Sequence, residues 1–242
     1  MFDEMLSGSD SQSREPYKKF QSWLDGQDLR KIARQSAQAE ELFRRMGITF
    51  NVYGDKDGEE RLIPFDTVPR ILSAGEWRKL EKGVVQRVAA INAFLKDLYG
   101  RQEIIRAGIV PSELINDNPA FLPQMCGFTP PGNVYTHIVG IDIVRTGADE
   151  FFVLEDNARV PSGVSYMIEN RATMLHMFPE LFAHNRVKPV KDYPKQLFNS
   201  LVSCVLAEKK DPNVVVLTPG IHNSAYYEHS FLADEMGVEL VQ

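Results

Sequence analysis

Two strand-like runs joined by a short turn constrain this chain more than any other feature. Val134–Arg145 and Phe151–Asn157 are apolar for most of their length, yet Asp142, Glu155 and Asn157 stand within them. A carboxylate inside a strand is costly to bury unless another group pairs with it. The pattern therefore predicts an antiparallel hairpin that carries a polar site.

The side-chain period of a strand places these polar residues relative to one another. Glu155 and Asn157 are two residues apart, so they point to the same face. If Arg145 lies opposite Glu150, with a four-residue turn between them, Asp142 projects to that same face, diagonal to Glu155. A loop one residue longer or shorter would turn Asp142 to the other face unless a bulge restored it.

Three oxygen donors on one face suit a hard cation such as Mg²⁺. This ion takes a few carboxylate or amide oxygens and completes its octahedron with water and phosphate oxygens. The alternative is a solvent-facing strand with charges on its wet side. The spacing of the three donors admits both interpretations.

The residues after the second run indicate a helix start. Pro161, Ser162 and Gly163 precede a helical pattern of apolar residues, so their backbone N–H groups could receive a phosphate or a carboxylate. Arg159 lies between the metal donors and this turn, where a guanidinium could hold an anionic intermediate. An ordinary helix start is the alternative for the Pro-Ser-Gly turn taken alone.

Four segments together carry a resemblance to a known family. They are VLEDNARVPSGVSYMIENR, GITFNVYGDKDGEERLIPFDTVPRIL, EWRKLEKGVVQRVAAINAFLKDLYG and VVVLTPGIHNSAYYEHSFLADEMGVELVQ. They cover essentially the whole chain and resemble the circularly permuted ATP-grasp proteins, often described as domains of unknown function. The D…E-x-N pattern is also similar to that of glutathionylspermidine synthase.

The resemblance implies a reaction and a set of site residues. ATP-grasp enzymes join a carboxylate to an amine through an acyl-phosphate made from ATP. By resemblance, Asp142, Glu155 and Asn157 hold Mg²⁺, and Pro161–Gly163 face the reacting carboxylate or the transferred phosphate. Arg159 is the expected catalytic residue, a fixed positive partner for the tetrahedral oxyanion. The implied substrates are a small-molecule or peptide carboxylate and an amine.

The resemblance also implies the architecture, an α/β fold that is α+β in its N-terminal part. We expect a loose segment at 1–15, then an ATP-grasp-like sheet with flanking helices at 16–211. Residues 212–242 read as the strand, helix and strand that begin a Rossmann-like domain. A parallel sheet does not close on one such unit, so this piece looks truncated. A complete small α/β tail is the alternative.

Local patterns predict several further elements. Periodicity and capping residues indicate helices at Asp28–Met46, at Ser73–Tyr99 with a Ser73–Glu76 capping box, and at Tyr193–Glu208. Turn residues Gly54–Gly58 suggest a second hairpin between Ile48–Tyr53 and Arg61–Phe65. The apolar stripe of the long helix is expected to be core: Trp77, Leu80, Val84, Val88, Ile91, Leu95 and Leu98.

Composition excludes some classes of function. The 242 residues are 43% hydrophobic, which is ample for a core, and the net charge is 27 − 33 = −6 with no basic block. Nucleic acid is therefore not an expected partner. No apolar run reaches the length of a membrane span and no signal pattern opens the chain, so we expect a cytoplasmic protein.

The two cysteines and the histidines carry little signal in the sequence. The spacing of Cys126 and Cys204 matches no disulfide or metal-binding pattern, so both are expected to be reduced thiols. The five histidines lack metal-ligand spacing. His137 lies five residues before Asp142, but in an unbulged strand it faces the opposite side.

Two functions of different classes follow. The first is the N-terminal part of an ATP- and Mg²⁺-dependent carboxylate–amine ligase. The second is a non-catalytic, ligase-derived binding module or one subunit of a split enzyme. In related chains the lysines that bind the nucleotide come from a later part of the sequence, so the isolated chain is expected to be inactive. An uncoupled Mg²⁺-dependent ATPase or kinase is a lesser alternative.

Overall fold

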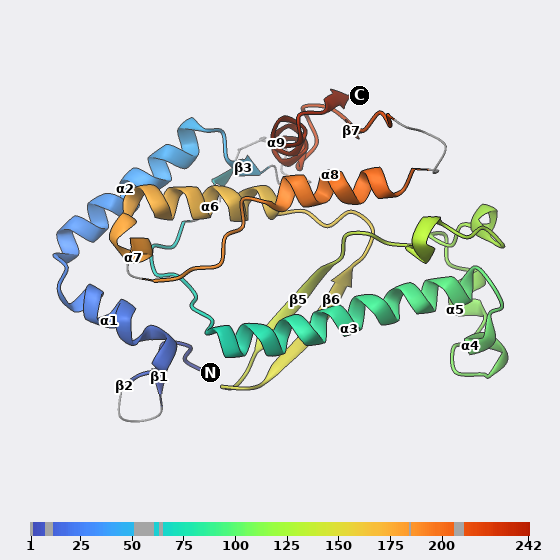
Figure 1. The fold of residues 1–242 in the computed structure, drawn as a ribbon, viewed down its shortest axis with the longest axis horizontal. Coiled ribbons are helices and arrows are strands. Elements are labelled where there is room, and N and C mark those ends of the chain that lie inside the picture. The colour runs from blue at the N-terminus through green and yellow to red at the C-terminus, as the bar shows by residue number, and fades with distance from the viewer. Residues whose placement is uncertain (1, 8–11, 51–60, 63–64, 184, 206–210) are drawn as a thin grey trace.

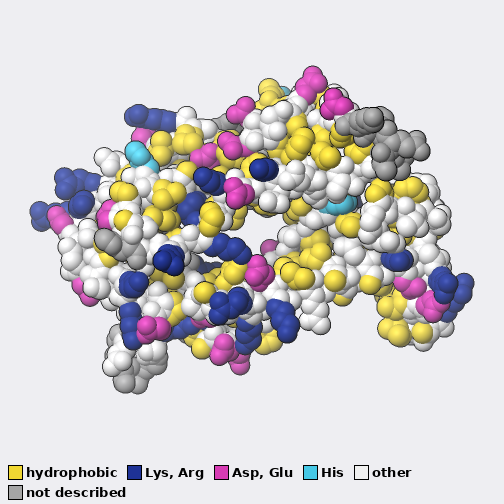
Figure 2. All heavy atoms as spheres, in the orientation of Figure 1, with side chains coloured by type: hydrophobic (Ala, Val, Ile, Leu, Met, Phe, Trp, Pro, Cys, Tyr) yellow, Lys and Arg dark blue, Asp and Glu magenta, His cyan; other side chains and the backbone are white. Residues whose placement is uncertain are grey.

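The computed structural model describes residues 2–7, 12–50, 61–62, 65–183, 185–205 and 211–242. Within them the chain is a mixed α/β protein, as predicted, with helices arranged around separate two-stranded sheets (Figure 1). Helices α2 (Leu29–Arg45), α6 (Val164–Met177) and α8 (Tyr193–Ser203) form one layer. Helix α3 (Ala74–Leu98) and the hairpin of β5 (Gly140–Arg145) and β6 (Phe151–Asn157) form the other. Figure 2 shows that the surface is hollowed between the two layers.

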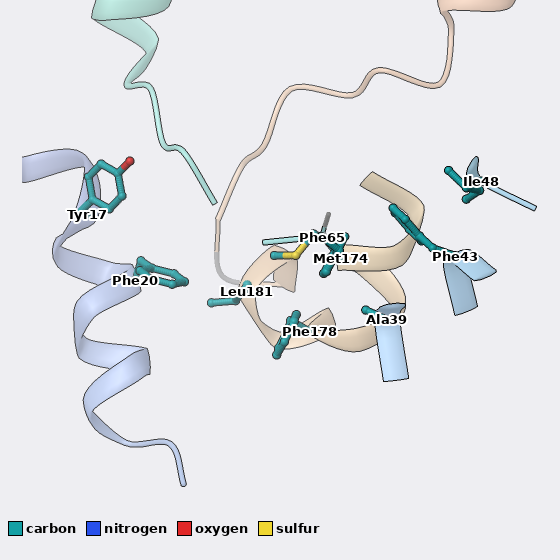
Figure 3. Packing of buried hydrophobic residues seen from close by; sticks show 9 residues of the cluster. All are labelled: Tyr17, Phe20, Ala39, Phe43, Ile48, Phe65, Met174, Phe178 and Leu181. Carbon is teal, nitrogen blue, oxygen red and sulfur yellow. The ribbon is translucent and has the colours of Figure 1, made fainter. Parts of the chain in front are cut away.

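The main core lies at one end of the molecule, where α1 (Lys18–Asp25) and α2 meet α6 and α7 (Pro179–Ala183). Figure 3 shows their side chains pointing toward one another. Phe43 and Phe178 are completely buried, and the Trp23 ring meets Phe178 edge-on at 5.6 Å between ring centroids. This cluster joins the N-terminal helices to the helix that follows the predicted site.

Helix α2 has the ends that the sequence predicts. The Asp28 side chain accepts a hydrogen bond from the Arg30 backbone N–H at 2.9 Å and so caps the first turn. At the other end Gly47 adopts a φ of 69°, the left-handed conformation that stops a helix and that glycine takes without strain.

Helix α3 is confirmed, but its apolar stripe is not the core that we predicted. Ser73 and Glu76 form the expected capping box. Of the stripe, Leu98 is buried and Trp77 is 41% exposed. The other five residues are half-buried: Leu80, Val84, Val88, Ile91 and Leu95. The physical reason is that α3 lies along a sheet of two strands, which is too narrow to cover the whole stripe.

The β5–β6 hairpin is confirmed, but its predicted register is wrong by one residue. Arg145 pairs with Phe151 instead of Glu150, so the loop comprises residues 146–150. The ladder then shifts between Asp142 and Ile143, where β6 carries one extra residue, Leu154. This bulge reverses the side-chain parity and sets Asp142 directly opposite Glu155. The bulge compensates for the longer loop, which by itself would turn Asp142 to the opposite face from Glu155.

The C-terminal residues form the predicted strand–helix–strand unit. Strands β7 (Val215–Leu217) and β8 (Glu239–Val241) are parallel, and α9 (Tyr226–Met236) connects them. Helix α9 also packs against α6 and α8. The C-terminal unit is thereby attached to the layer that contains the helix start after β6.

The remaining elements are short. Strands β3 (Thr49–Phe50) and β4 (Arg61–Leu62) pair antiparallel, as predicted, while the turn Gly54–Gly58 lies outside the described residues. In the segment expected to be loose, β1 (Leu6–Ser7) pairs with β2 (Gln12–Ser13). Helices α4 (Glu103–Arg106) and α5 (Glu113–Asn116) follow α3. No described helix is both long and apolar enough to cross a membrane.

Candidate metal and substrate site

The three predicted metal donors come together on one face of the hairpin. Asn157 Nδ2 lies 3.1 Å from Glu155 Oε1 and 3.4 Å from Asp142 Oδ2. All three side chains are exposed. The cross-strand pairing of Asp142 with Glu155 and the two-residue step to Asn157 bring them to this position.

The donor set fits a hard cation. It offers two carboxylates and one amide, and the amide can present its oxygen after rotation of the side chain. Among the described residues, no group of three or more His, Cys, Asp or Glu side chains could hold a metal. The trio has only two residues of those types, so it needs further oxygen ligands from water or phosphate to complete an octahedron.

The opposite face of the hairpin is anchored to α3. The Asp156 carboxylate accepts two hydrogen bonds from Arg87, from Nε at 2.7 Å and from Nη2 at 2.6 Å. The bonds from Arg87 hold the pKa of Asp156 below its ordinary value. The two neighbouring carboxylates of β6 thus have different surroundings. Asp156 is neutralised by Arg87 of α3, whereas Glu155 faces away from α3.

A second anchor ties the turn end of the hairpin to the start of α3. Glu76 pairs with Arg145 of β5 and with Arg14, whose Nη2 lies 2.6 Å from Glu76 Oε1. Burial alone would raise the pKa of Glu76, but the Ser73 backbone N–H and the two guanidinium groups lower it to about 2. The Arg145 side chain is only 4% exposed, so its buried guanidinium needs anionic partners, which are Glu76 and, at 3.9 Å, Glu4.

The connection from β6 to α6 passes from one layer to the other (Figure 1). The buried Thr136 hydroxyl donates to the Ala158 carbonyl at 2.7 Å and fixes its beginning. Gly140 allows the close approach of Pro161, because a Cβ at position 140 would stand 2.9 Å from the Pro161 Cβ. Arg159 is exposed, and the described residues give its side chain no hydrogen bond or ion pair.

A carboxylate of the protein itself occupies the helix start. Glu228 of α9 accepts hydrogen bonds from the Gly163 N–H, at 2.9 Å to Oε1 and 2.8 Å to Oε2. Its Oε2 also accepts from the Ser165 N–H at 2.9 Å and from the Ser165 hydroxyl at 2.6 Å. Glu228 is 4% exposed and Ser165 is completely buried. The Gly163 amide that we predicted to face a substrate therefore binds Glu228 in this structure.

Residues without a distinguishing sequence signal hold this site in place. Glu228 lies in an ordinary helical pattern 65 residues after Gly163, and no sequence signal distinguishes it from an exposed helical glutamate. Asn92 of α3 is similar: its Oδ1 accepts from the N–H groups of Tyr135 at 2.7 Å and Thr136 at 3.1 Å. Only the fold brings these groups to the ends of the hairpin.

The face that carries the trio is open in the described structure. Val144 and Phe152 pair with each other across the strands and share this face with Asp142. They are 43% and 59% exposed. A ligand at the trio would therefore meet apolar side chains on one side and the connection to α6 on the other.

Comparison with known proteins identifies the family. The model of a family described as "a circularly permuted ATPgrasp" matches residues 69–242, which include the three oxygen donors, Arg159, the Pro161–Gly163 turn and Glu228. The chain belongs to the circularly permuted ATP-grasp family. The resemblance that the sequence suggested is thereby confirmed.

Relatives of this ATP-grasp chain occur in several bacteria. It is 49% identical over 221 residues to an uncharacterized protein of Synechocystis sp. and 46% identical over 243 residues to one of Mycobacterium tuberculosis. The alignments cover 91% and 100% of this chain. A Frankia alni protein named "Putative glutamate–cysteine ligase 2-3" is 42% identical over 221 residues, which cover 90% of this chain.

The permuted ATP-grasp chain spans less than half of each of these relatives. The alignments cover 46% of the Synechocystis protein, 43% of the Mycobacterium tuberculosis protein and 25% of the Frankia alni protein. Names given to the longer proteins therefore describe molecules with a further portion that this chain does not match.

Proposed function

We propose that this chain carries the magnesium site of an ATP-dependent ligase that joins a carboxylate to an amine through an acyl-phosphate. The observation that carries the proposal is the convergence of Asp142, Glu155 and Asn157 on one open face of the hairpin. Membership of the ATP-grasp family supports the use of ATP. The non-catalytic module remains the alternative, and the experiment below distinguishes the two.

The residues of the site have distinct tasks in this proposal. Asp142, Glu155 and Asn157 would hold Mg²⁺, which when bound would supply charge neutralisation for the phosphate oxygens of ATP. Arg159 is exposed and unpaired within the described structure, so its guanidinium is free to stabilise the oxyanion formed when the amine attacks. The Pro161–Gly163 turn lies beside both, and Glu228 holds it in position.

Glu228 modifies the substrate-binding prediction. Because it already accepts from the Gly163 and Ser165 amides, an incoming anion would have to displace it or bind elsewhere on the turn. We propose that the anion binds at the Arg159 side of the turn and that Glu228 keeps the amides satisfied beneath it. The substrate-contacting part of the turn then comprises Pro161 and Ser162.

The Frankia relatives suggest the first substrates to test. The Frankia alni protein and a Frankia casuarinae protein, which is 42% identical over 197 residues, are both named putative glutamate–cysteine ligases. These names point to an amino acid as the carboxylate substrate and another amino acid as the amine. Both kinds of substrate carry the groups that the proposed reaction joins. Since the reaction consumes ATP, we propose that it takes place in the cytoplasm.

The test measures coupling between ATP cleavage and amide formation. The native protein, isolated from its own cells, is incubated with Mg²⁺, ATP, glutamate labelled with heavy oxygen in its carboxylates, and cysteine or another amine. An acyl-phosphate mechanism transfers one labelled oxygen to the released phosphate, because the attacking carboxylate oxygen leaves with it.

Two outcomes would contradict the proposal. Phosphate release that carries no label from any carboxylate tested, and that does not rise with any amine, would indicate an uncoupled ATPase. Absence of ATP cleavage in a native protein that still binds Mg²⁺ and ATP would favour the non-catalytic module.

A further inference from the structure

A thiol, an imidazole and a hydroxyl meet away from the metal site. Cys204, at the end of α8, places its Sγ 3.1 Å from His137 Nε2. The other ring nitrogen, Nδ1, lies 3.2 Å from the Ser200 hydroxyl oxygen. His137 and Cys204 are 67 residues apart in the sequence, so the fold alone creates this contact.

The cluster contains a nucleophile, the Cys204 thiol, next to a base, the His137 ring, and a hydroxyl that orients the base. In one tautomer, Nδ1–H donates to Ser200 Oγ and Nε2 is left to take up the thiol proton. Sγ lies 3.9 Å from Nδ1 as well as 3.1 Å from Nε2, so it stands beside the ring, and the exposed ring has to turn to point Nε2 at the thiol. The thiol can also donate to the Ser200 carbonyl, whose oxygen lies 3.3 Å from Sγ. Cys204 is half-buried and His137 is exposed, so a small reagent can reach the sulfur.

The position of His137 explains why strand parity does not apply to it. It precedes β5, which begins at Gly140, so the alternation of the strand does not determine its direction. Its neighbour Thr136 is fixed by Asn92 and by the Ala158 carbonyl. The His137 ring can therefore turn toward α8, on the side where Ser200 and Cys204 lie.

We propose that Cys204 is a reactive thiol, activated by His137, that forms a mixed disulfide with low-molecular-weight disulfides. The thiol proton passes to His137 Nε2, and the sulfur attacks one sulfur of the incoming disulfide. A new S–S bond forms, the old one breaks, and the released thiolate takes up a proton from the imidazolium or from water. This modification site is independent of the proposed ligase function.

The second cysteine provides an internal reference. Cys126 is exposed, and the described residues place no imidazole within hydrogen-bonding distance of its thiol. Solvent access alone would make Cys126 the faster thiol. Activation by His137 predicts the reverse order, because a base next to the sulfur can accept the thiol proton as the sulfur attacks.

The test compares single-cysteine forms of the protein. Cys126→Ser retains only Cys204, and Cys204→Ser retains only Cys126. Each is treated at neutral pH with excess dithiodipyridine, a neutral disulfide, and release of its chromophoric thione is followed. We expect Cys204 to react about tenfold or more faster than Cys126.

Two further changes in the Cys126→Ser background identify the cause. His137→Gln, which cannot take up the thiol proton, should lower the rate of Cys204 at least to that of Cys126. Ser200→Ala, which keeps the imidazole, should lower it by a smaller factor. His222→Gln, at an exposed histidine, is the matched control and should leave the rate unchanged. Equal rates for the two cysteines, or a Cys204 rate unaffected by His137→Gln, would overturn the proposal.

Discussion

At the level of single residues, the polar groups of the hairpin divide between two faces with different tasks. Asp156 and Arg145 point toward α3, where Arg87 and Glu76 neutralise them. Asp142 and Glu155 face the open side without a cationic partner among the described residues. Two adjacent carboxylates that no cation of the protein neutralises repel each other, and a bound metal ion would relieve that repulsion.

The first prediction concerns this pair. Asp142→Asn and Glu155→Gln should each weaken Mg²⁺ binding by about tenfold or more, because each removes a charged ligand. Calorimetric titration with MgCl₂, with and without ATP, measures the effect. Glu150→Gln, an exposed carboxylate at the turn end of the same hairpin, should leave the affinity unchanged. Unchanged affinity in both site variants would show that the metal assignment is wrong.

The second prediction concerns Glu228. Glu228→Ala leaves two backbone N–H groups and a buried hydroxyl without their acceptor, so we expect a loss of about 2–4 kcal/mol in the free energy of unfolding. Urea denaturation measures it. Glu235→Ala, at an exposed position of the same helix, should change stability by less than about 0.5 kcal/mol. Equal stabilities of the two variants would contradict the role assigned to Glu228.

At the level of elements, the hairpin shows what a sequence pattern can and cannot specify. Alternation and turn residues predicted both strands and the shared face of Asp142, Glu155 and Asn157. They did not predict the loop length or the bulge at Leu154, because one extra residue can be placed at several points of a ladder at similar cost. The extra loop residue and the extra residue in the bulge each reverse which face a side chain points to, and the two reversals cancel. The three side chains therefore share one face although the predicted register was wrong.

The third prediction concerns the junction of the hairpin with α3. Glu76→Gln should reduce stability at neutral pH by about 2–4 kcal/mol, because it removes the carboxylate shared by Arg14 and the buried Arg145 and leaves Arg145 with Glu4 at 3.9 Å. Glu81→Gln, at a half-exposed ion pair on the same helix, should have an effect below about 1 kcal/mol.

The effect of Glu76→Gln should depend on pH in a defined direction. The folded pKa of Glu76, about 2, lies below its ordinary value of 4.5, so its stabilisation is complete above pH 4.5 and is lost as the pH falls toward 2. The difference between wild type and variant should therefore shrink across that window. Thermal unfolding at several pH values tests it, and a constant difference down to pH 2 would contradict the assigned pKa.

At the level of the whole molecule, packing and polar contacts are separated in space. The apolar core joins α1 and α2 to α6 and α7, whereas the ion pairs Arg87–Asp156 and Glu76–Arg145 join α3 to the hairpin. The connection from β6 to α6 links the two parts (Figure 1). Changes in the core should therefore affect stability without altering the donor set.

The fourth prediction tests that separation. Phe178→Ala, at a completely buried ring, should cost about 3–5 kcal/mol of stability. Phe152→Ala, at a ring on the open face of the hairpin, should cost less than about 1 kcal/mol. At temperatures well below the midpoint of thermal unfolding, where the Phe178→Ala protein is folded, its Mg²⁺ affinity should equal that of the wild type. A large loss of affinity in folded Phe178→Ala protein would show that core and site are coupled.

The sequence by itself determined the local elements and the family. Helix caps at Asp28 and Ser73, the strand–helix–strand at the C-terminus and the shared face of Glu155 and Asn157 follow from short-range spacing. The place of Asp142 on that face depended also on the loop length and the bulge. Such signals are readable because capping and strand alternation depend on neighbours in the chain.

Only the tertiary structure decided which distant groups meet. Glu228 reaches Gly163, His137 reaches Cys204, and Leu98 alone of its stripe is buried. None of these follows from local spacing, because a helical glutamate or an apolar stripe has the same pattern whether it faces solvent or another element. Which of these groups is buried, and against which partner, depends on how the two layers pack together. That packing cannot be read from a single segment of the chain.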